Sequence, residues 1–309
     1  MSPNTAVVVT VFNEENTVAD LVRSLRTQSL LPAEAVIVDG GSSDDTWKVL
    51  QDLAHSWIKL RVYRVAGNRS VGRNYGVSKT SSPIFAFTDA GCLPKRDWLE
   101  KLTQPFSDSK VNVVSGYYKG EARTPFQQAL IPYVLVMPDK ARKGEFYPAT
   151  RSMALRRSVW KRSGGFDVSL AHNEDYAFAH KLKALGYDFY FKKEAVVVWI
   201  PRQNLGQATW MFLRFAVGDI QAGIIRPQVK KLFIRYLIFA YMISLSFYWP
   251  FLRPALLVMT IVYLIWSIVK NFRYVHGIKP LFWLPVLQIT ADFSIIFGSV
   301  LGFLSRGLK

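Results

Sequence analysis

Carboxylate side chains that could bind a metal ion or accept a proton occur at three places in this 309-residue chain. Asp39 and Asp89 each follow a short apolar run, and Glu174 and Asp175 form an adjacent pair. Carboxylate oxygens are ligands for Mg²⁺ and can act as general bases. Gly91 stands where a second carboxylate would complete a paired site with Asp89. One carboxylate can still hold Mg²⁺ together with phosphate oxygens and water, so the pattern predicts either such a site or only the turn after a strand.

The first part of the chain alternates short apolar runs with segments of helical periodicity. Strands are predicted at 6–11, 35–38, 60–65 and 83–88, and helices at 16–27, 46–54 and 71–78. Apolar strands separated by helices predict an α/β fold with a mostly parallel sheet covered on both faces. Ligands bind at the carboxyl ends of the strands in such folds, so the polar segments 10–15, 39–45 and 89–92 are expected on one rim of the sheet.

The C-terminal part of the chain is strongly apolar. Three runs, near 232–250, 252–269 and 281–304, approach the ~20 helical residues that a bilayer core requires. We therefore predict one domain of residues 1–225 and a membrane domain of residues 226–309 with about three transmembrane helices. Two spans with a re-entrant hairpin, or a buried helical domain of a soluble protein, are the alternatives.

Basic residues outnumber acidic ones and give a net charge of +17. Such a balance favours nucleic acid, anionic lipid or phosphorylated substrates as partners. The chain has no nucleic-acid-binding motif, and acids at the sheet rim would repel a phosphate backbone, so no nucleic acid is expected. The single cysteine, Cys92, excludes a disulfide within the chain and a metal site with several cysteine ligands.

Lysine and arginine also predict the orientation in the membrane. Six of them precede the first apolar run or lie between the second and the third: Arg226, Lys230, Lys231, Lys270, Arg273 and Lys279. Only Arg253 lies between the first two runs. The positive-inside rule therefore predicts a multi-pass protein of the cell membrane with residues 1–225 in the cytoplasm. With three spans, Arg306 and Lys309 would lie outside, against that rule.

One acidic residue, Asp292, lies within the apolar runs. An ionisable residue at membrane depth is expected to have a partner or a function. Pairing with Arg235, which would hold the helices together, is favoured over contact with a lipid.

Six motifs in order along residues 5–220 resemble family 2 glycosyltransferases. They are Thr10-Val11-Phe12-Asn13-Glu14-Glu15, Val38-Asp39-Gly40-Gly41-Ser42-Ser43-Asp44-Asp45-Thr46, Gly72-Arg73-Asn74-Tyr75-Gly76, Thr88-Asp89-Ala90-Gly91, Gly164-Gly165-Phe166-Asp167 and Asn173-Glu174-Asp175-Tyr176. The resemblance implies a GT-A fold, a nucleotide-sugar donor such as a UDP- or GDP-sugar, and a divalent cation, Mg²⁺ or Mn²⁺. A cation that bridges the donor phosphates stabilises the charge of the leaving group as the glycosidic bond breaks.

The resemblance also implies roles for residues that bind the donor. Asp39 matches the residue that contacts the nucleobase, although an Asx-turn would also explain an Asp before Gly-Gly. Thr10, Asn13 and Glu14 are expected to line the base and ribose pocket. Arg73 is either a nucleotide contact or a solvated helix residue.

Further residues match the metal and diphosphate positions of the family. Asp89 matches the first acid of the Asp-x-Asp motif and is expected to bind the metal and the donor. His172 is a second candidate metal ligand, although a single His is more often a plain surface or core residue. Arg214 is expected to contact the diphosphate.

The pair Glu174-Asp175 matches the catalytic motif of the family. By this resemblance Asp175 is the base that deprotonates the acceptor hydroxyl, and Glu174 is a supporting acid. Both would also suit the N-terminus of a helix, where acids are favoured.

The acceptor is indicated by weaker signals. The Gln-x-x-Arg-Trp motif of polymerising members is not matched at 207–210 or 213–215, which favours addition of one sugar over chain extension. An apolar segment at 130–137 precedes a basic run at 140–162, a combination that suits a membrane surface or simply a solvated basic face. A membrane-bound transferase with a lipid or lipid-linked acceptor is therefore predicted. A catalytically inactive scaffold, suggested by Gly40 and Gly91, and a polysaccharide-extending transferase are the alternatives.

Overall fold

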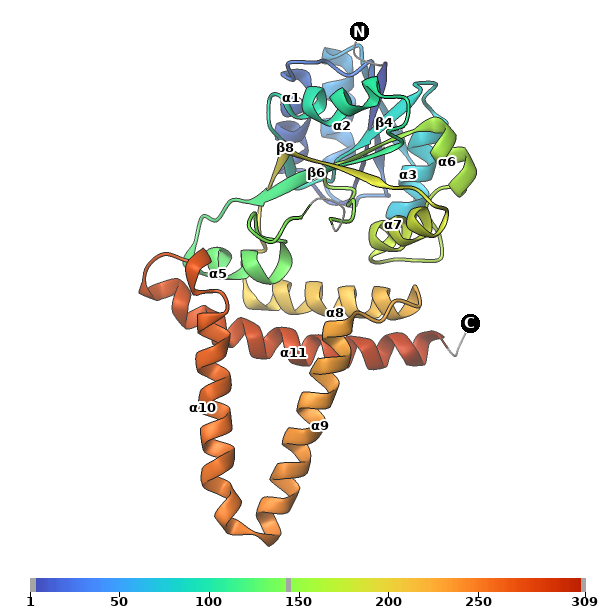
Figure 1. Cartoon of the computed structure of the whole chain (residues 1–309). Coiled ribbons are helices and arrows are strands. Elements are labelled where there is room, and N and C mark those ends of the chain that lie inside the picture. The colour runs from blue at the N-terminus through green and yellow to red at the C-terminus, as the bar shows by residue number, and fades with distance from the viewer. Residues whose placement is uncertain (1–3, 143–145, 307–309) are drawn as a thin grey trace. The chain divides into compact units, whose positions relative to one another are not determined.

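The computed structural model describes residues 4–142 and 146–306, which form two compact units (Figure 1). The first unit comprises Met1–Gly120 and Met137–Ile200, and the second comprises Glu121–Val136 and Pro201–Lys309. A domain boundary at residue 225 remains a prediction. Lys143 and Glu145 of the basic run lie outside the described residues.

Eight strands of the first unit form one sheet in the order β3-β2-β1-β4-β7-β6-β8-β5. They are β1 (Thr5–Val11), β2 (Glu34–Asp39), β3 (Leu60–Arg64), β4 (Ile84–Phe87), β5 (Cys92–Pro94), β6 (Val113–Gly120), β7 (Met153–Arg156) and β8 (Phe189–Trp199). β1 to β4 run parallel, and β6 pairs parallel with β8. β7 and β5 run antiparallel to their neighbours. The predicted α/β fold with a mostly parallel sheet is confirmed.

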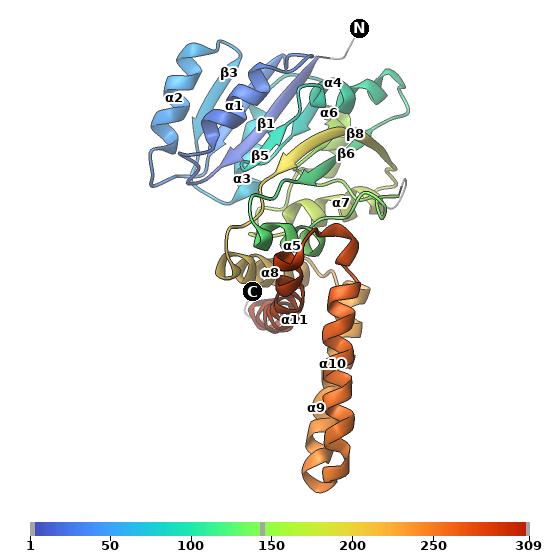
Figure 2. The same cartoon turned by 90° about the vertical axis from the view of Figure 1, so that its left-hand side faces the viewer.

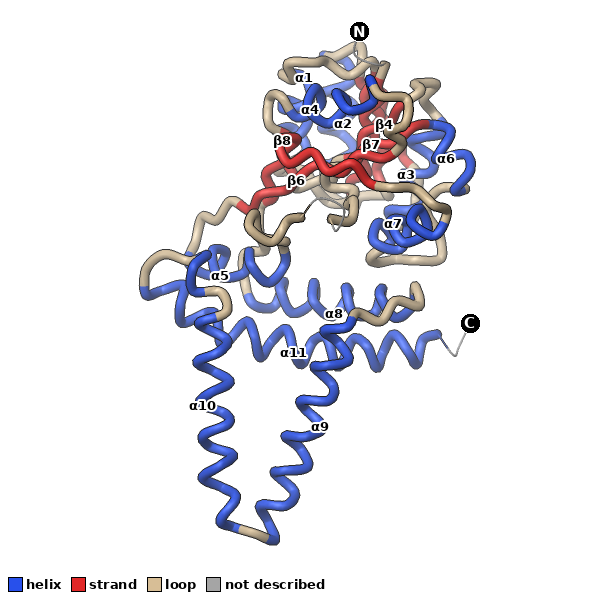
Figure 3. The backbone as a smooth tube through the Cα atoms, in the orientation of Figure 1, coloured by secondary structure: helices blue, strands red, loops and turns tan. Residues whose placement is uncertain are grey.

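Helices flank this sheet on the chain segments between the strands (Figure 3). They are α1 (Val18–Arg26), α2 (Thr46–Ser56), α3 (Arg69–Ser78), α4 (Trp98–Thr103), α6 (Arg157–Ser163) and α7 (Glu174–Ala184), with a short 3-10 helix at Gln104–Ser107. All four strands and three helices predicted up to residue 88 are present. Their apolar positions are the buried ones, as on α1, where Leu21 and Leu25 are buried. Burial of the apolar face therefore explains why the local pattern predicted these elements correctly.

Helix α3 packs closely on the sheet because glycine faces it. A Cβ on Gly76 would lie 2.6 Å from Cγ1 of Val8 and 3.4 Å from Cγ2 of Val38, both of which are fully buried. We expect Gly76→Ala to lower the free energy of unfolding by about 1–3 kcal/mol through overpacking, seen as a lower melting temperature. Gly206→Ala is the matched control, because a Cβ there would meet only the Asn204 side chain at 3.5 Å. Equal melting temperatures for the two variants would contradict this account.

The second unit is helical. It consists of α5 (Pro125–Val134), α8 (Leu205–Gln221), α9 (Pro227–Tyr248), α10 (Arg253–Val269) and α11 (Ile278–Arg306), with short 3-10 helices at Pro250–Leu252 and Phe272–Tyr274. Three segments, Pro227–Tyr248, Pro250–Tyr274 and Ile278–Arg306, are long and apolar enough to cross a membrane. The sequence prediction of C-terminal helices with transmembrane character is confirmed.

Within this unit α9 and α10 form a hairpin, and α11 lies beside α8 (Figures 1 and 2). The predicted partnership of Asp292 and Arg235 is confirmed, because Arg235 Nη2 lies 2.9 Å from Asp292 Oδ2. The carboxylate also accepts hydrogen bonds from the hydroxyls of Tyr236 and Tyr263 and from Gln288 Nε2. These contacts join α9, α10 and α11.

Candidate active site

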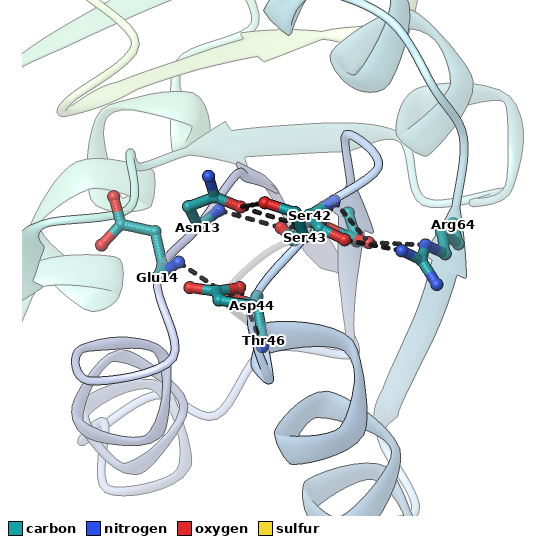
Figure 4. A network of polar contacts seen from close by, with 8 residues as sticks. Asn13, Glu14, Ser42, Ser43, Asp44, Thr46 and Arg64 are labelled. Atoms are coloured by element: carbon teal, nitrogen blue, oxygen red, sulfur yellow. Dashed lines mark hydrogen bonds and ion pairs between the residues drawn. The ribbon is translucent and has the colours of Figure 1, made fainter.

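The ends of β1 and β2 meet at one rim of the sheet, as predicted (Figure 4). The backbone N–H of Asn13 donates to Ser42 Oγ at 2.9 Å, and the N–H of Ser43 donates to Asn13 Oδ1 at 2.9 Å. The N–H of Glu14 donates to Thr46 Oγ1 at 2.7 Å. These bonds join the segments 10–15 and 39–46 at the rim.

Two predicted donor-binding residues have structural partners in this rim. Asp39 is fully buried and accepts hydrogen bonds from the N–H and the hydroxyl of Ser42, while Arg64 Nε lies 3.1 Å from Asp39 Oδ2. Thr10 packs under α3, where a Cβ on Gly72 would lie 2.7 Å from its Cγ2. The turn-forming role that was the alternative for Asp39 is therefore present in the structure, and contact with a nucleobase remains a prediction.

Arg73 joins two acidic residues that are far apart in the sequence. Its Nη2 lies 2.8 Å from Asp89 Oδ1, and its Nη1 lies 2.5 Å from Glu174 Oε1. Only 2% of the Arg73 side chain is exposed, so the alternative of a solvated helix residue is wrong. Asp89 follows β4, Glu174 begins α7, and Arg73 lies on α3, so three elements position this cluster.

Electrostatics keeps Arg73 and Asp89 ionised. Burial alone would lower the pKa of Arg73, but the charges of Asp89 and Glu174 outweigh it and raise that pKa. Burial likewise opposes ionisation of Asp89, but the neighbouring charges of Arg73 and Arg151 lower its pKa below the ordinary value. Glu174 Oε2 is buried without a hydrogen-bond partner in the described part of the chain, so this acid has one unused oxygen beside the cluster.

Asp175 has the opposite shift. Burial, followed by the negative charges of Glu174 and Asp89, raises the pKa of its carboxyl above the usual range for Asp. Its Oδ1 accepts a hydrogen bond from the N–H of Tyr176 at 2.8 Å in the first turn of α7. A carboxylate with a raised pKa binds a proton more readily and is better suited to act as a base near neutral pH.

This shift makes a prediction for the pH dependence of any reaction that needs Asp175 as a base. Protonation removes the base, so activity should fall as the pH drops through the raised pKa of Asp175. The acidic limb of kcat/KM should therefore lie above the ordinary Asp value of about 3.9. A pH–rate profile on the full chain measures the limb. A limb at or below the ordinary value would contradict the assignment.

Arg151 is a residue of this site that sequence reasoning missed. Its guanidinium carbon lies 5.3 Å from the ring centre of Tyr118 and 5.5 Å from that of Trp199. Its charge acts on both Asp89 and Asp175. In the sequence it is one of many cations in the run 140–162, and no local signal distinguishes it from them.

The position beside Asp89 cannot supply a second acidic ligand. Gly91 has a φ of +73° and nothing within 4 Å of a Cβ built on it. Cys92 is buried, and burial together with the charge of Asp89 raises the pKa of its thiol to about 12, so it stays protonated at neutral pH. Cys92 therefore acts as a small packed residue and not as a metal-binding thiolate.

The side chains present fit a divalent cation only in part. Among residues 4–142 and 146–306, no three His, Cys, Asp or Glu side chains come close enough to hold a metal together. Arg73 occupies Asp89 Oδ1 and leaves Oδ2 for another ligand. One carboxylate oxygen suits Mg²⁺ or Mn²⁺ when phosphate oxygens and waters complete the coordination.

The structure does not test the roles of two further predicted site residues. His172 is in the turn before α7, and its role as a metal ligand remains a prediction. Arg214 lies on α8 in the second unit, with its guanidinium carbon 5.9 Å from the ring centre of Trp210. Its contact with a diphosphate also remains a prediction.

The sequence of this chain matches a known protein family. Residues 6–163, about half of the chain, match the family model described as glycosyl transferase family 2. Glycosyltransferase AglE of Haloferax volcanii is 23% identical over 253 residues, which cover 75% of this chain and 78% of that protein. Succinoglycan biosynthesis protein ExoA of Rhizobium meliloti is 25% identical over 236 residues, which cover 70% of this chain and 69% of that protein.

Solved structures share the fold at low sequence identity. The mannosyltransferase PcManGT of Pyrobaculum calidifontis, in complex with GDP-Man and Mn²⁺, matches 100% of this chain and 76% of its own, with 17% identity and a TM-score of 0.57. Residues 1–349 of S. aureus TarS, in complex with UDP, match 70% of this chain and 65% of their own, with 18% identity and a TM-score of 0.52.

Proposed function

This chain belongs to glycosyl transferase family 2, and on that premise we propose that it transfers one sugar from a nucleotide-sugar donor to a lipid or lipid-linked acceptor. The observation that supports this most strongly is the cluster of Arg73, Asp89 and Glu174 with Asp175 beside it. Asp89, which has a lowered pKa, suits ligand binding, and Asp175, which has a raised pKa, suits proton transfer.

In this proposal the donor binds along the rim formed by the ends of β1, β2 and β4. Asp39, with Thr10, Asn13 and Glu14, contacts the nucleobase and ribose. Arg73 holds Asp89 in place, and Arg151 balances negative charge on the diphosphate. The neighbours with GDP-Man and with UDP make a GDP- or UDP-sugar the donor class to test first.

Asp89 would be the protein ligand of Mg²⁺ or Mn²⁺, and His172 is a second candidate. When bound, the cation supplies positive charge to the donor phosphates. The chain's own residues then act on the acceptor. Asp175 takes the proton of the acceptor hydroxyl, whose oxygen forms the new bond to the sugar as the bond to the diphosphate breaks.

The helices of the second unit support a lipid acceptor. Three helices with the length and composition of membrane spans belong to the same chain as the transferase domain. They would hold the active site near a membrane, where a lipid acceptor is found. The positive-inside rule supports a position in the cell membrane with the transferase domain in the cytoplasm. Loss of the polymerising motif at 207–215 favours a single transfer.

Calorimetric titration of the full chain with UDP, GDP and their sugar conjugates, with and without Mn²⁺, tests the donor site. We expect metal-dependent binding of one nucleotide, weakened roughly 10- to 100-fold in Asp89→Asn through loss of a charged contact. Asp20→Asn is the matched control, because Asp20 is exposed and pairs with Arg23 on α1.

A membrane scaffold without activity is the second candidate, favoured by Gly91 and by the engagement of Asp89 Oδ1 with Arg73. Absence of binding to every nucleotide, with and without Mn²⁺, would support the scaffold and overturn the transferase proposal.

A further inference from the structure

The three apolar helices of the second unit differ in their surroundings. The difference shows in the most apolar 18 residues of each segment. Of these residues, 11% are buried in Pro227–Tyr248, 6% in Pro250–Tyr274 and 44% in Ile278–Arg306. α9 and α10 expose large side chains such as Leu237, Phe247, Leu257 and Val262. Helices that present apolar side chains to their surroundings are suited to lipid, whereas α11 has extensive protein partners.

The C-terminal half of α11 packs on α8 through two glycines four residues apart. A Cβ on Gly298 would lie 2.5 Å from Leu213 O, and a Cβ on Gly302 would lie 2.9 Å from Ile220 Cβ. Gln221 Nε2 donates to Ser305 Oγ at 3.0 Å. Small residues at this spacing let helix backbones approach closely, so α11 and α8 are joined along their length.

The N-terminal half of α11 packs on α5. The Tyr133 hydroxyl donates to the carbonyl oxygen of Leu284 at 2.7 Å, and the rings of Phe126 and Trp283 are 5.1 Å apart. α5 has 10 residues, well short of the ~20 that a bilayer core requires.

α8 is also a poor candidate for a membrane span. It has 17 residues and includes Arg214 and Asp219, and it is not among the segments suited to cross a membrane. An α11 that crossed the bilayer would therefore have to take α5 and α8 into the hydrocarbon with it.

The hairpin of α9 and α10 meets α11 near its middle. Asp292 contacts Arg235 and Tyr236 on α9 and Tyr263 on α10. At 1.5 Å per residue, Arg235 is ~12 Å from the start of α9 and Tyr263 is ~9 Å from the end of α10. Most of the hairpin thus extends beyond α11, which runs crosswise to the hairpin in Figure 1 and is seen nearly end-on in Figure 2.

The exposed face of α11 carries an apolar stripe. Its members recur at intervals of three, four or seven residues and are all at least 39% exposed: Phe282, Ile289, Phe293, Phe297, Val300 and Leu304. The opposite face holds the contacts to α5 and α8. A helix with one packed face and one apolar face can lie in the plane of a membrane surface.

We propose that α9 and α10 are the two membrane spans and that α11 lies in the membrane surface, with this stripe in contact with lipid. The stripe adjoins the hairpin, and the partner is the lipid monolayer on the side of the transferase domain. Two spans place the C-terminus on the same side as residues 1–226.

The distribution of basic residues supports two spans. Arg306 is then on the same side of the membrane as five other basic residues: Lys230, Lys231, Lys270, Arg273 and Lys279. This removes the exception to the positive-inside rule that three spans create.

Single-cysteine labelling tests this topology. Cys92 is buried and gives a low background. Arg306→Cys reports the end of α11, Ile58→Cys reports the transferase domain, and Phe251→Cys reports the tip of the hairpin; all three positions are exposed. Sealed vesicles of known orientation are treated with a membrane-impermeant maleimide.

We expect Arg306→Cys to react from the same side as Ile58→Cys and from the side opposite to Phe251→Cys. Reaction from the side of Phe251→Cys would mean that α11 crosses the membrane and would overturn the proposal. A protease-cleavable tag fused after the last residue repeats the measurement without a substitution. Cleavage from the side that labels Ile58→Cys is expected, and cleavage from the other side alone would overturn the proposal.

Discussion

Replacing Asp175 with Asn is expected to lower the rate of sugar transfer by about 10²- to 10⁴-fold, the usual contribution of a positioned general base. The amide keeps the size of the side chain but cannot accept the proton of the acceptor hydroxyl. Donor binding should change little, because Asp89 and the rim of the sheet are intact. Release of the nucleoside diphosphate at saturating donor and acceptor measures the rate, and calorimetry with the donor measures binding.

Asp188→Asn is the control for this experiment. Asp188 also belongs to the first unit, but its side chain is 93% exposed and pairs with Lys183. Its variant should keep the wild-type rate. An unchanged rate in Asp175→Asn would exclude Asp175 as the base and direct attention to Glu174, whose Oε2 is buried without a partner among the described residues.

Replacing Arg73 with Met is expected to destabilise the protein by about 3–5 kcal/mol, because two acids lose their cation in a mostly buried cluster. The side chains of Arg73 and Glu174 are 2% and 3% exposed, and that of Asp89 is 28% exposed. For a unit of this size the change corresponds to a melting temperature lower by roughly 10 °C. Thermal unfolding of the full chain in detergent, followed by tryptophan fluorescence, measures it.

Lys183→Met is the matched control, since it removes one partner of an exposed ion pair and should leave the melting temperature nearly unchanged. The double variant Arg73→Met/Glu174→Gln should lose less stability than the sum of the two single variants, because neutral Gln no longer needs the cation. Arg73→Lys should recover only part of the loss, since one ammonium cannot reproduce the forked contacts to both acids. Equal melting temperatures for Arg73→Met and Lys183→Met would show that the contacts of Arg73 with Asp89 and Glu174 do not stabilise the fold.

The local pattern of the sequence determined much of the first unit. Apolar runs such as 6–11 and 35–38 are buried strands, and the polar segments that follow them meet at one rim. These features depend on the spacing of apolar and polar residues within a short segment, so the sequence alone predicts them. The six motifs and the apolar C-terminal runs likewise identified the family and the helices with membrane character.

The partnership of Asp292 and Arg235 was also predicted, because an ionised group in an apolar segment needs an opposite charge and the segment offers few.

Tertiary structure alone decided how the acids are used. Glu174 is 101 residues from Arg73, so no local pattern predicts that one guanidinium holds both Asp89 and Glu174. Arg151 is indistinguishable from its basic neighbours until Tyr118 and Trp199 enclose it beside the acids. Likewise hydropathy gives α9, α10 and α11 the same character, because it measures composition and not partners. The packing of α11 on α5 and, through Gly298 and Gly302, on α8 separates it from the hairpin.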